Sequence, residues 1–383
     1  MTKYLVMGGA GDMGSSVAED LVSSGVEEVE ICDYNKTSAE NLANSLSKRE
    51  KSKVSFSTID INNRKDLFRV LENTDIVVNT IGPFYKYEKI VIDAAIETEK
   101  DYVDICDDYD ATLNVVDKYG SSENIHSKIL IGMGWTPGIT NVCARAGYLS
   151  LDKASDINIA WTGSAADSAG LAVISHVFHA VSGDVPMYLS GKIEYVPARQ
   201  FKRVIEFPEP VGAVSTYFVG HPEPITIPRY LKNLKNVTLR GALLPDWHNH
   251  LVNQFADVGL TEDKKINVNN TEISSRDFLA SFVHQTMEQF KSGGVETSGF
   301  WVEVIGEKDG KHTKITYFGL DHMRNLTGWS ASIGAQYISR ARQALPGLYA
   351  PEGIIDPKYF FSELSKRGVM ISKETVQSEF EKG

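Results

Sequence analysis

The stretch KYLVMGGAGDMGSSVAEDL, residues 3–21, joins a short apolar run to a glycine cluster and then to an amphipathic pattern. The glycines have the spacing GxGxxG, which by itself also occurs in turns that bind nothing. Here they follow a predicted strand, open a predicted helix, and precede an acid, Asp33, that ends the next apolar run. Such a turn lets the backbone approach a pyrophosphate, which the N–H groups of the helix N-terminus then bind. The predicted cofactor-binding residues of this segment are Gly9, Gly11, Asp12, Met13, Gly14 and Asp33.

The first part of the chain repeats this strand and helix alternation. Six short apolar runs, with helical patterns between them, occupy residues 4–7, 29–32, 54–59, 76–81, 102–106 and 129–131. Strands that alternate with helices predict a parallel sheet covered on both sides, the doubly wound α/β fold of Rossmann type. Asp33 ends the second run, where a carboxylate binds the adenosine ribose and repels a 2′-phosphate. We therefore expect NAD as the cofactor, with NADP less favoured.

Ligands of such folds lie at the carboxyl ends of the strands, so the residues that follow each run are candidates. After the third and fourth runs, the expected cofactor contacts are Asp60, Ile61, Thr80, Gly82 and Pro83. The fifth run leads into DICDDYD, residues 104–110. Carboxylates this close do not all stay ionised without partners, and we expect Asp104 or Asp107 to bind a substrate ammonium or to transfer protons. The alternative is that Asp108 or Asp110 caps a helix in solvent.

The sixth run is followed by GMGWTPGITN, residues 132–141. Thr136 suits an N-cap and Pro137 suits the first helical position, which predicts a helix that starts at Pro137. That N-terminus would favour an anion, either the cofactor or a substrate carboxylate. We therefore expect Trp135 and Pro137 to be substrate-binding residues, although Trp135 also suits ordinary packing between domains.

From about residue 152 the strand patterns alternate apolar and polar residues, as in an antiparallel sheet. Residues 299–320 predict a hairpin that turns at Asp309-Gly310, and helices are expected around 169–182 and 275–291. The chain is thus expected to hold an inserted α+β domain on a mainly antiparallel sheet. We expect a discontinuous Rossmann domain, 1–136 and about 328–383, and a substrate and dimerisation domain, about 137–327.

Two features of this second domain are candidates for chemistry. Arg240 has a planar fork that suits a carboxylate, and Gly241 beside it permits close approach, whereas an ordinary surface ion pair is an equally good interpretation. His176 and His179 share a predicted helix face, and His248 and His250 form a second group. Neither group has the cysteines or the HExxH spacing of a zinc site, so no metal is expected.

Composition excludes several classes of protein. The chain has 383 residues and a formal net charge of −11, which argues against broad binding to nucleic acid or to anionic membranes. No run of eighteen apolar residues and no signal-peptide pattern are present, so we expect a cytoplasmic protein that does not enter membranes. The three cysteines form no CxxC pair and are expected to be buried and reduced.

The glycine motif with Asp33, together with NTIGPF, YVDICDD, GMGWTPGITN, LRG, ADVGL and the closing YAPEGIIDPKYFFSELSKRGVMIS, resembles the saccharopine dehydrogenase-like family. Within it, length and tail are most similar to lysine 6-dehydrogenase. The resemblance implies oxidation of a C–N bond with a nicotinamide cofactor, and a homodimer. It also implies that Arg240 binds a substrate carboxylate and that His176 lies near the active site. The segments GSAADSAG and LPDWHNH match no single subgroup, which leaves the substrate undecided.

The expected activity is therefore NAD(P)-dependent oxidation of the C–N bond of an amino acid, most similar to oxidative deamination by L-lysine 6-dehydrogenase. Saccharopine dehydrogenase and carboxynorspermidine dehydrogenase activities are the alternatives within the family. A non-catalytic NAD-binding sensor or assembly protein is the alternative from another class. A reductase of C=O or C=C bonds is a third interpretation, because a fold by itself does not fix the reaction.

Overall fold

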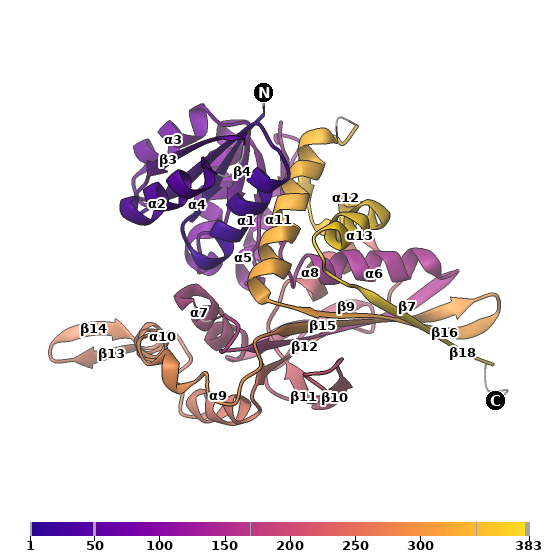
Figure 1. The fold of residues 1–383 in the computed structure, drawn as a ribbon. Helices are drawn as coiled ribbons and strands as arrows, with labels where there is room; N and C mark the ends of the chain where they lie inside the picture. Colours follow the sequence, from indigo (N-terminus) through magenta and orange to yellow (C-terminus); the bar gives the residue numbers. More distant parts are fainter. Residues whose placement is uncertain (1, 49–50, 169, 342, 380–383) are drawn as a thin grey trace. The chain divides into compact units, whose positions relative to one another are not determined.

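The computed structural model describes residues 2–48, 51–168, 170–341 and 343–379 (Figure 1). The chain divides into two compact units, one comprising Met1–Ile139 with Arg324–Arg367 and the other Thr140–Met323 with Gly368–Gly383. No described helix is both long enough and apolar enough to cross a membrane.

The first unit is built on a seven-stranded sheet of order β17-β6-β5-β4-β1-β2-β3, in which every described strand pair is parallel. Its strands are β1 (Lys3–Met7), β2 (Glu28–Asp33), β3 (Lys53–Thr58), β4 (Ile76–Asn79), β5 (Asp101–Asp104), β6 (Lys128–Leu130) and β17 (Gly347–Tyr349). Its helices are α1 (Asp12–Ser23), α2 (Lys36–Leu46), α3 (Arg64–Glu72), α4 (Phe84–Glu97), α5 (Tyr109–Tyr119), α11 (Met323–Arg340), α12 (Pro351–Ile354) and α13 (Pro357–Lys366). The Rossmann-type doubly wound fold predicted from the sequence is confirmed.

The strand order reverses between β1 and β4, which lie side by side although two strands separate them along the chain. This switch point is where open parallel sheets bind their ligands, beyond the carboxyl ends of the strands. The central strands are fully buried because helices flank the sheet, and Leu5, Val77 and Tyr102 are each 0% exposed.

The C-terminal part of the chain returns to this unit and packs on α1. A Cβ at Gly328 of α11 would lie 2.4 Å from the Ser16 side chain, so a glycine is needed at this close contact. The Arg367 guanidinium donates to the Asp20 carboxylate at 2.7 and 2.9 Å, and both side chains are nearly buried. The return to the first unit ends there, because β18 (Ser372–Ser378) pairs with β16 of the second unit. The expectation that all residues to 383 join the first domain is therefore wrong for the last segment.

The second unit contains a nine-stranded sheet among its described residues, in the order β10-β11-β12-β7-β15-β16-β18, with β8 beside β12 and β9 beside β8. The remaining strands are β7 (Lys153–Ser164), β8 (Asp184–Leu189), β9 (Lys192–Pro197), β10 (Arg203–Glu206), β11 (Ala213–Phe218), β12 (Asn236–Leu244), β15 (Ser298–Lys308) and β16 (Lys311–Asp321). The pair β7 and β12 is parallel and the other pairs are antiparallel, as expected for a mainly antiparallel sheet. The hairpin turns at Asp309 and Gly310, both with positive φ, as predicted.

The helices of this unit are α6 (Ile139–Ser150), α7 (Leu171–Ala180), α8 (Glu223–Tyr230), α9 (Trp247–Asp257) and α10 (Ser275–Gln285), and β13 (Lys265–Val268) and β14 (Thr271–Ser274) form a separate hairpin. Residue 169, where one helix was expected to begin, lies outside the described residues, and that helix is described from Leu171. Helix α6 starts two residues later than expected. Gly134 N–H donates to the Pro137 carbonyl at 2.9 Å, and this tight turn occupies Pro137 and Gly138 before the helix begins.

Candidate functional site

The turn between β1 and α1 requires glycine at two positions. Gly8 has a φ of +71°, and a Cβ at Gly14 would lie only 2.2 Å from the Gly8 carbonyl oxygen. Helix α1 begins at Asp12, and no side-chain hydrogen bond caps its N-terminus in the described structure. A glycine turn that leads to the N–H groups of a helix N-terminus fits the pyrophosphate of a dinucleotide.

Asp33 lies at the end of β2 and stabilises the glycine turn through a hydrogen bond. Its Oδ2 accepts the Ala10 N–H and its Oδ1 accepts the Asn35 N–H, each at 3.0 Å, and the side chain is nearly buried. Each carboxylate oxygen has more than one acceptor direction, so these bonds leave room for a ribose hydroxyl. The next residue, Tyr34, is 86% exposed, so the chain turns outward immediately after the acid.

Thr80, after β4, is brought against the glycine turn across the switch point. Its hydroxyl donates to the Met7 carbonyl at 2.8 Å, and its Oγ1 would lie 2.6 Å from a Cβ at Gly14. Gly82 and Pro83 follow, joined by a cis peptide bond, and Pro83 precedes the first residue of α4. Asp60 and Ile61 instead follow β3, where the Asp60 carboxylate accepts from Asn62. No described hydrogen bond joins these two residues to the glycine turn.

Asp104, at the end of β5, is wholly buried and already engaged. Its Oδ1 accepts the N–H groups of Cys106 and Gly132 at 3.0 and 2.7 Å, and the Tyr102 hydroxyl donates to Oδ2 at 2.9 Å. Burial raises the pKa of Asp104 to about 6, and these hydrogen bonds oppose that rise. Burial, followed by repulsion from Asp104, also holds the pKa of Glu88 well above its usual range. Asp104 thus fixes the loops after β5 and β6 instead of facing a ligand.

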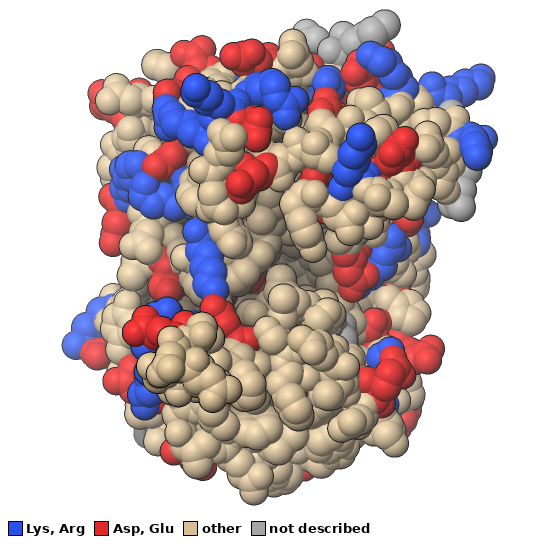
Figure 2. All heavy atoms as spheres, turned by 90° about the vertical axis from the view of Figure 1, so that its left-hand side faces the viewer, with Lys and Arg blue, Asp and Glu red and all other residues tan. Residues whose placement is uncertain are grey.

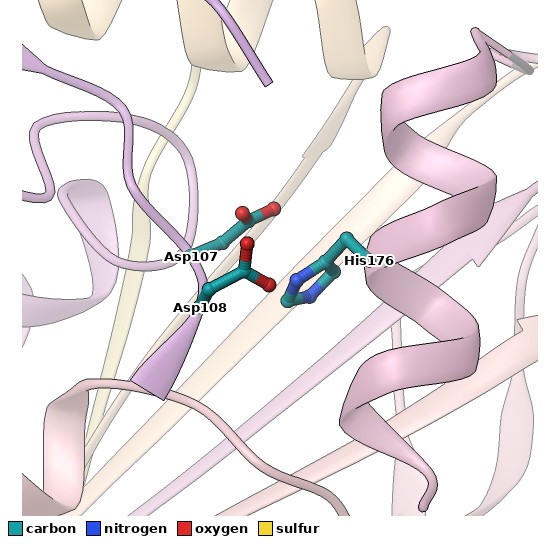
Figure 3. A group of neighbouring side chains, drawn as sticks. All are labelled: Asp107, Asp108 and His176. Carbon is teal, nitrogen blue, oxygen red and sulfur yellow. The ribbon is translucent and has the colours of Figure 1, made fainter. Parts of the chain in front are cut away.

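The following loop carries the next two acids. Asp107 is partly exposed, whereas Asp108 is buried and accepts the Tyr85 N–H at 3.0 Å. Figure 3 shows both aspartates on the loop after β5, and His176 projecting from α7. Of the two acids predicted as proton carriers, Asp104 is wholly buried and Asp107 is partly exposed. Trp135 in the loop after β6 is 6% exposed, so it is a packed side chain of the first unit.

His176 belongs to a buried polar group within the second unit that the sequence analysis did not foresee. The His176 and His221 rings meet edge to face with their centroids 5.1 Å apart. His221 Nδ1 lies 2.8 Å from Glu223 Oε2, and the Thr140 hydroxyl donates to Glu223 Oε1 at 2.9 Å. Glu223 and Thr140 are 0% exposed and His221 is 1% exposed. Because a carboxylate can only accept, the His221 Nδ1 donates to Glu223, and this bond fixes the orientation of the ring.

Only a short segment of the sequence could have indicated this histidine group. His221 and Glu223 stand two residues apart in VGHPEP, where α8 begins at Glu223, and no periodic pattern indicates them. Thr140 is 83 residues away from Glu223 in the chain. Only the packing of α6 beside this segment brings the hydroxyl to the carboxylate.

Arg240 and the histidine group lie on opposite faces of the second unit's sheet. On β12, Arg240 is opposite Ala160 of β7, and Gly241 is opposite Trp161. Successive residues of a strand point to opposite faces, so Arg240 and Trp161 lie on opposite faces. The Trp161 ring is 6.0 Å from that of His221, which places the histidine group on the Trp161 face. The structure therefore does not bring Arg240 together with His176.

The Arg240 guanidinium also contacts neighbouring side chains of its own unit. Its guanidinium stacks 4.2 Å from the Phe218 ring centroid, and burial and then the neighbouring Arg203 lower its pKa to about 10. Gly241 has a packing reason to be glycine, since a Cβ there would lie 2.4 Å from the Trp161 ring. Neither observation requires a substrate carboxylate at this position.

Two family models match the chain. The saccharopine dehydrogenase NADP binding domain matches residues 5–125, and the saccharopine dehydrogenase C-terminal domain matches residues 134–369. Among solved structures, the chain is similar to apo saccharopine dehydrogenase (L-Glu forming) from Saccharomyces cerevisiae, with 16% identity, a TM-score of 0.69, and coverage of 98% of this chain and 100% of that one. A match to Pen from Bacillus thuringiensis has 16% identity, covers 34% of this chain and 50% of that one, and has a TM-score of 0.29, from which we draw nothing.

Proposed function

Because the chain belongs to the saccharopine dehydrogenase-like family, we propose that it is a nicotinamide-dependent oxidoreductase that oxidises the C–N bond of an amino acid. The observation that carries this proposal is the glycine turn, which has no room for a side chain at Gly14 and leads to an uncapped helix N-terminus. We further propose an L-lysine 6-dehydrogenase type of reaction, with saccharopine and carboxynorspermidine as alternative substrate types. The chain resembles the first type in length and tail.

The cofactor supplies the hydride acceptor when bound. Gly9, Gly11 and Gly14 would bind its pyrophosphate at the start of α1, and Asp33 would bind the adenosine ribose. Since the Asp33 carboxylate repels a 2′-phosphate, we propose NAD as the preferred cofactor, although the matching domain model is described as NADP binding. The two oxidised cofactors must therefore be compared side by side.

The second unit supplies a base for the proton that leaves the substrate amine. Glu223 holds His221 with a ring proton on Nδ1, and we propose Nε2 as the atom that accepts the substrate proton. Thr140 fixes the carboxylate, and His176 packs against His221. These residues hold the imidazole in a fixed orientation, which a general base requires.

Spectrophotometry tests the proposal. Purified protein is mixed with NAD⁺ or NADP⁺ and with L-lysine, saccharopine, L-ornithine or a carboxylated polyamine, and the absorbance of the reduced nicotinamide is followed. We expect growth of this band with one substrate class and faster turnover with NAD⁺. Cofactor binding with no turnover of any substrate would instead support a non-catalytic sensor, and absence of cofactor binding would refute the proposal.

A further inference from the structure

The first unit contains an open pocket of about 700 Å³ that the proposed chemistry does not use. It lies among the C-terminal end of α11, the segment that leads into β17, and the helices α12 and α13. Its lining residues include Tyr337, Arg340, Gln343, Tyr349 and Tyr359, and none of them belongs to the glycine turn. Pockets of this volume bind molecules larger than a single ring.

Three tyrosine side chains line this pocket, from α11, β17 and α13. The ring centroids of Tyr337 and Tyr359 lie 5.3 Å apart, with an angle of 52° between the ring planes. The Tyr349 hydroxyl donates to the Leu345 carbonyl at 2.8 Å, which holds that ring against the preceding segment. All three tyrosines are partly exposed, so ring surface remains for a ligand to contact. Aromatic side chains at such a site favour a ligand with a planar apolar body.

Arg340 is the charged residue of this pocket, since its other described lining residues are uncharged. The side chain is exposed, and its described hydrogen bond runs from Nη2 to Oε1 of Gln336 at 3.3 Å. No ion pair joins Arg340 to a carboxylate in the part of the chain that the structure describes. A guanidinium has five N–H donors in a planar fork, so Arg340 retains donors for the two oxygens of a carboxylate.

The Tyr359 hydroxyl is a second donor near the Arg340 charge. Burial and then repulsion from Glu363 raise the pKa of Tyr359, whereas the Arg340 charge opposes that rise. The hydroxyl therefore keeps its proton at neutral pH and can donate to an anion. Glu363 itself is paired with Lys366 at 2.5 Å and Arg367 at 3.0 Å, and it does not line this pocket.

The protein as a whole does not attract anions. Its formal net charge is −11, and on the face shown in Figure 2 the Lys and Arg side chains are interspersed with Asp and Glu side chains. Binding of an anion therefore requires a local cation such as Arg340.

We propose that this pocket binds a planar aromatic carboxylate, with the anionic group on the Arg340 guanidinium and the rings against Tyr337 and Tyr359. One guanidinium balances one negative charge, which favours a carboxylate over a doubly charged phosphate. The volume accommodates a ligand of more than one ring. This inference goes beyond the proposed dehydrogenase activity, because no residue of this pocket has a role in it.

The test compares 6-fluoro-2-naphthoate with 6-fluoro-2-naphthamide, which has nearly the same shape but no charge. Binding of each probe to the full-length protein is measured by ¹⁹F NMR titration, with and without excess NADH. We expect saturable binding of the carboxylate, about tenfold or more tighter than that of the amide, as charge-assisted hydrogen bonds provide. Excess NADH should change neither dissociation constant, and displacement of the carboxylate by NADH would overturn the proposal.

Variants locate the probes. Arg340→Gln keeps a polar side chain but removes the charge, so it should weaken carboxylate binding to the level of the amide and leave amide binding unchanged. Arg64→Gln is the matched control, because it removes the same charge from a side chain that is 68% exposed and outside this pocket. Ala344→Trp fills the pocket and should weaken both probes at least about tenfold, and Ala341→Phe is a second filler if the first variant does not fold.

Three results would contradict these expectations. Lack of saturable carboxylate binding by the wild-type protein would overturn the proposal, as would unchanged binding in a folded filler variant. Equal affinity for the two probes, or equal losses in Arg340→Gln and Arg64→Gln, would overturn the assigned contact with Arg340. Turnover with the nicotinamide cofactor is measured separately, so either proposal can fail alone.

Discussion

The substitution Gly14→Ala adds one methyl group at the contact between α1 and the glycine turn. Its Cβ would lie 2.2 Å from the Gly8 carbonyl oxygen and 2.8 Å from the Gly8 carbonyl carbon. An ordinary contact begins at 3.4 Å, so the first distance must grow by 3.4 − 2.2 = 1.2 Å. Both atoms belong to the Gly8 backbone and cannot rotate aside, and the Thr80 Oγ1 would also lie only 2.6 Å away. Over-packing typically costs about 1–3 kcal/mol, and we expect the upper end of that range.

The same displacement separates β1 from the start of α1, where the proposed pyrophosphate site lies. We therefore expect the dissociation constant of NADH, measured by fluorescence titration, to rise at least about tenfold, and the urea midpoint to fall in parallel. Gly170→Ala is the matched control, because a Cβ at Gly170 meets nothing within 4 Å. A Gly14→Ala protein with wild-type stability and wild-type NADH affinity would refute the packing argument.

Three further predictions concern the candidate site. Glu223→Gln keeps the shape of the side chain but loses the charge that fixes the His221 tautomer. We therefore expect kcat/KM to fall about 10–100-fold, with a changed pH profile and an unchanged NADH affinity. An unaltered pH profile would count against His221 as the base. Arg240→Gln should change kcat/KM by less than about threefold, because the sheet separates Arg240 from the histidine group, and a large rise in KM would restore the assignment made from sequence. Burial raises the pKa of Asp104 from 3.8 to about 6, so the folded state binds this proton more tightly than the unfolded chain does, and the free energy of unfolding should fall as the pH rises from about 4 to about 6. Urea titrations of Asp104→Asn should show a flatter dependence over that range, and an unchanged slope would mean that another group, such as Glu88, controls it.

The order of strands and helices in the first unit was predictable because its signals are local. Each apolar run is bounded by turn residues, and the glycine spacing reflects steric needs of a single turn. The predicted sheet lacked β17, a three-residue strand at Gly347–Tyr349, because so short a segment has no periodicity of its own. The helix expected at Pro137 starts at Ile139 because a backbone bond between Gly134 and Pro137 closes a turn first.

Sequence alone determined the family, the Rossmann-type unit with its glycine turn, the position of Asp33 and the hairpin at Asp309 and Gly310, since each depends on neighbouring residues and on the allowed values of φ. Tertiary structure decided which polar residues face one another. In the sequence, Asp104 is one of several neighbouring acids with no feature that distinguishes it. Only the hydrogen bonds from Tyr102, Cys106 and Gly132 show that it holds the loops after β5 and β6 in place. The bond between Thr140 and Glu223, and the sheet face of Arg240, depend on how distant segments pack and pair, which no local pattern records.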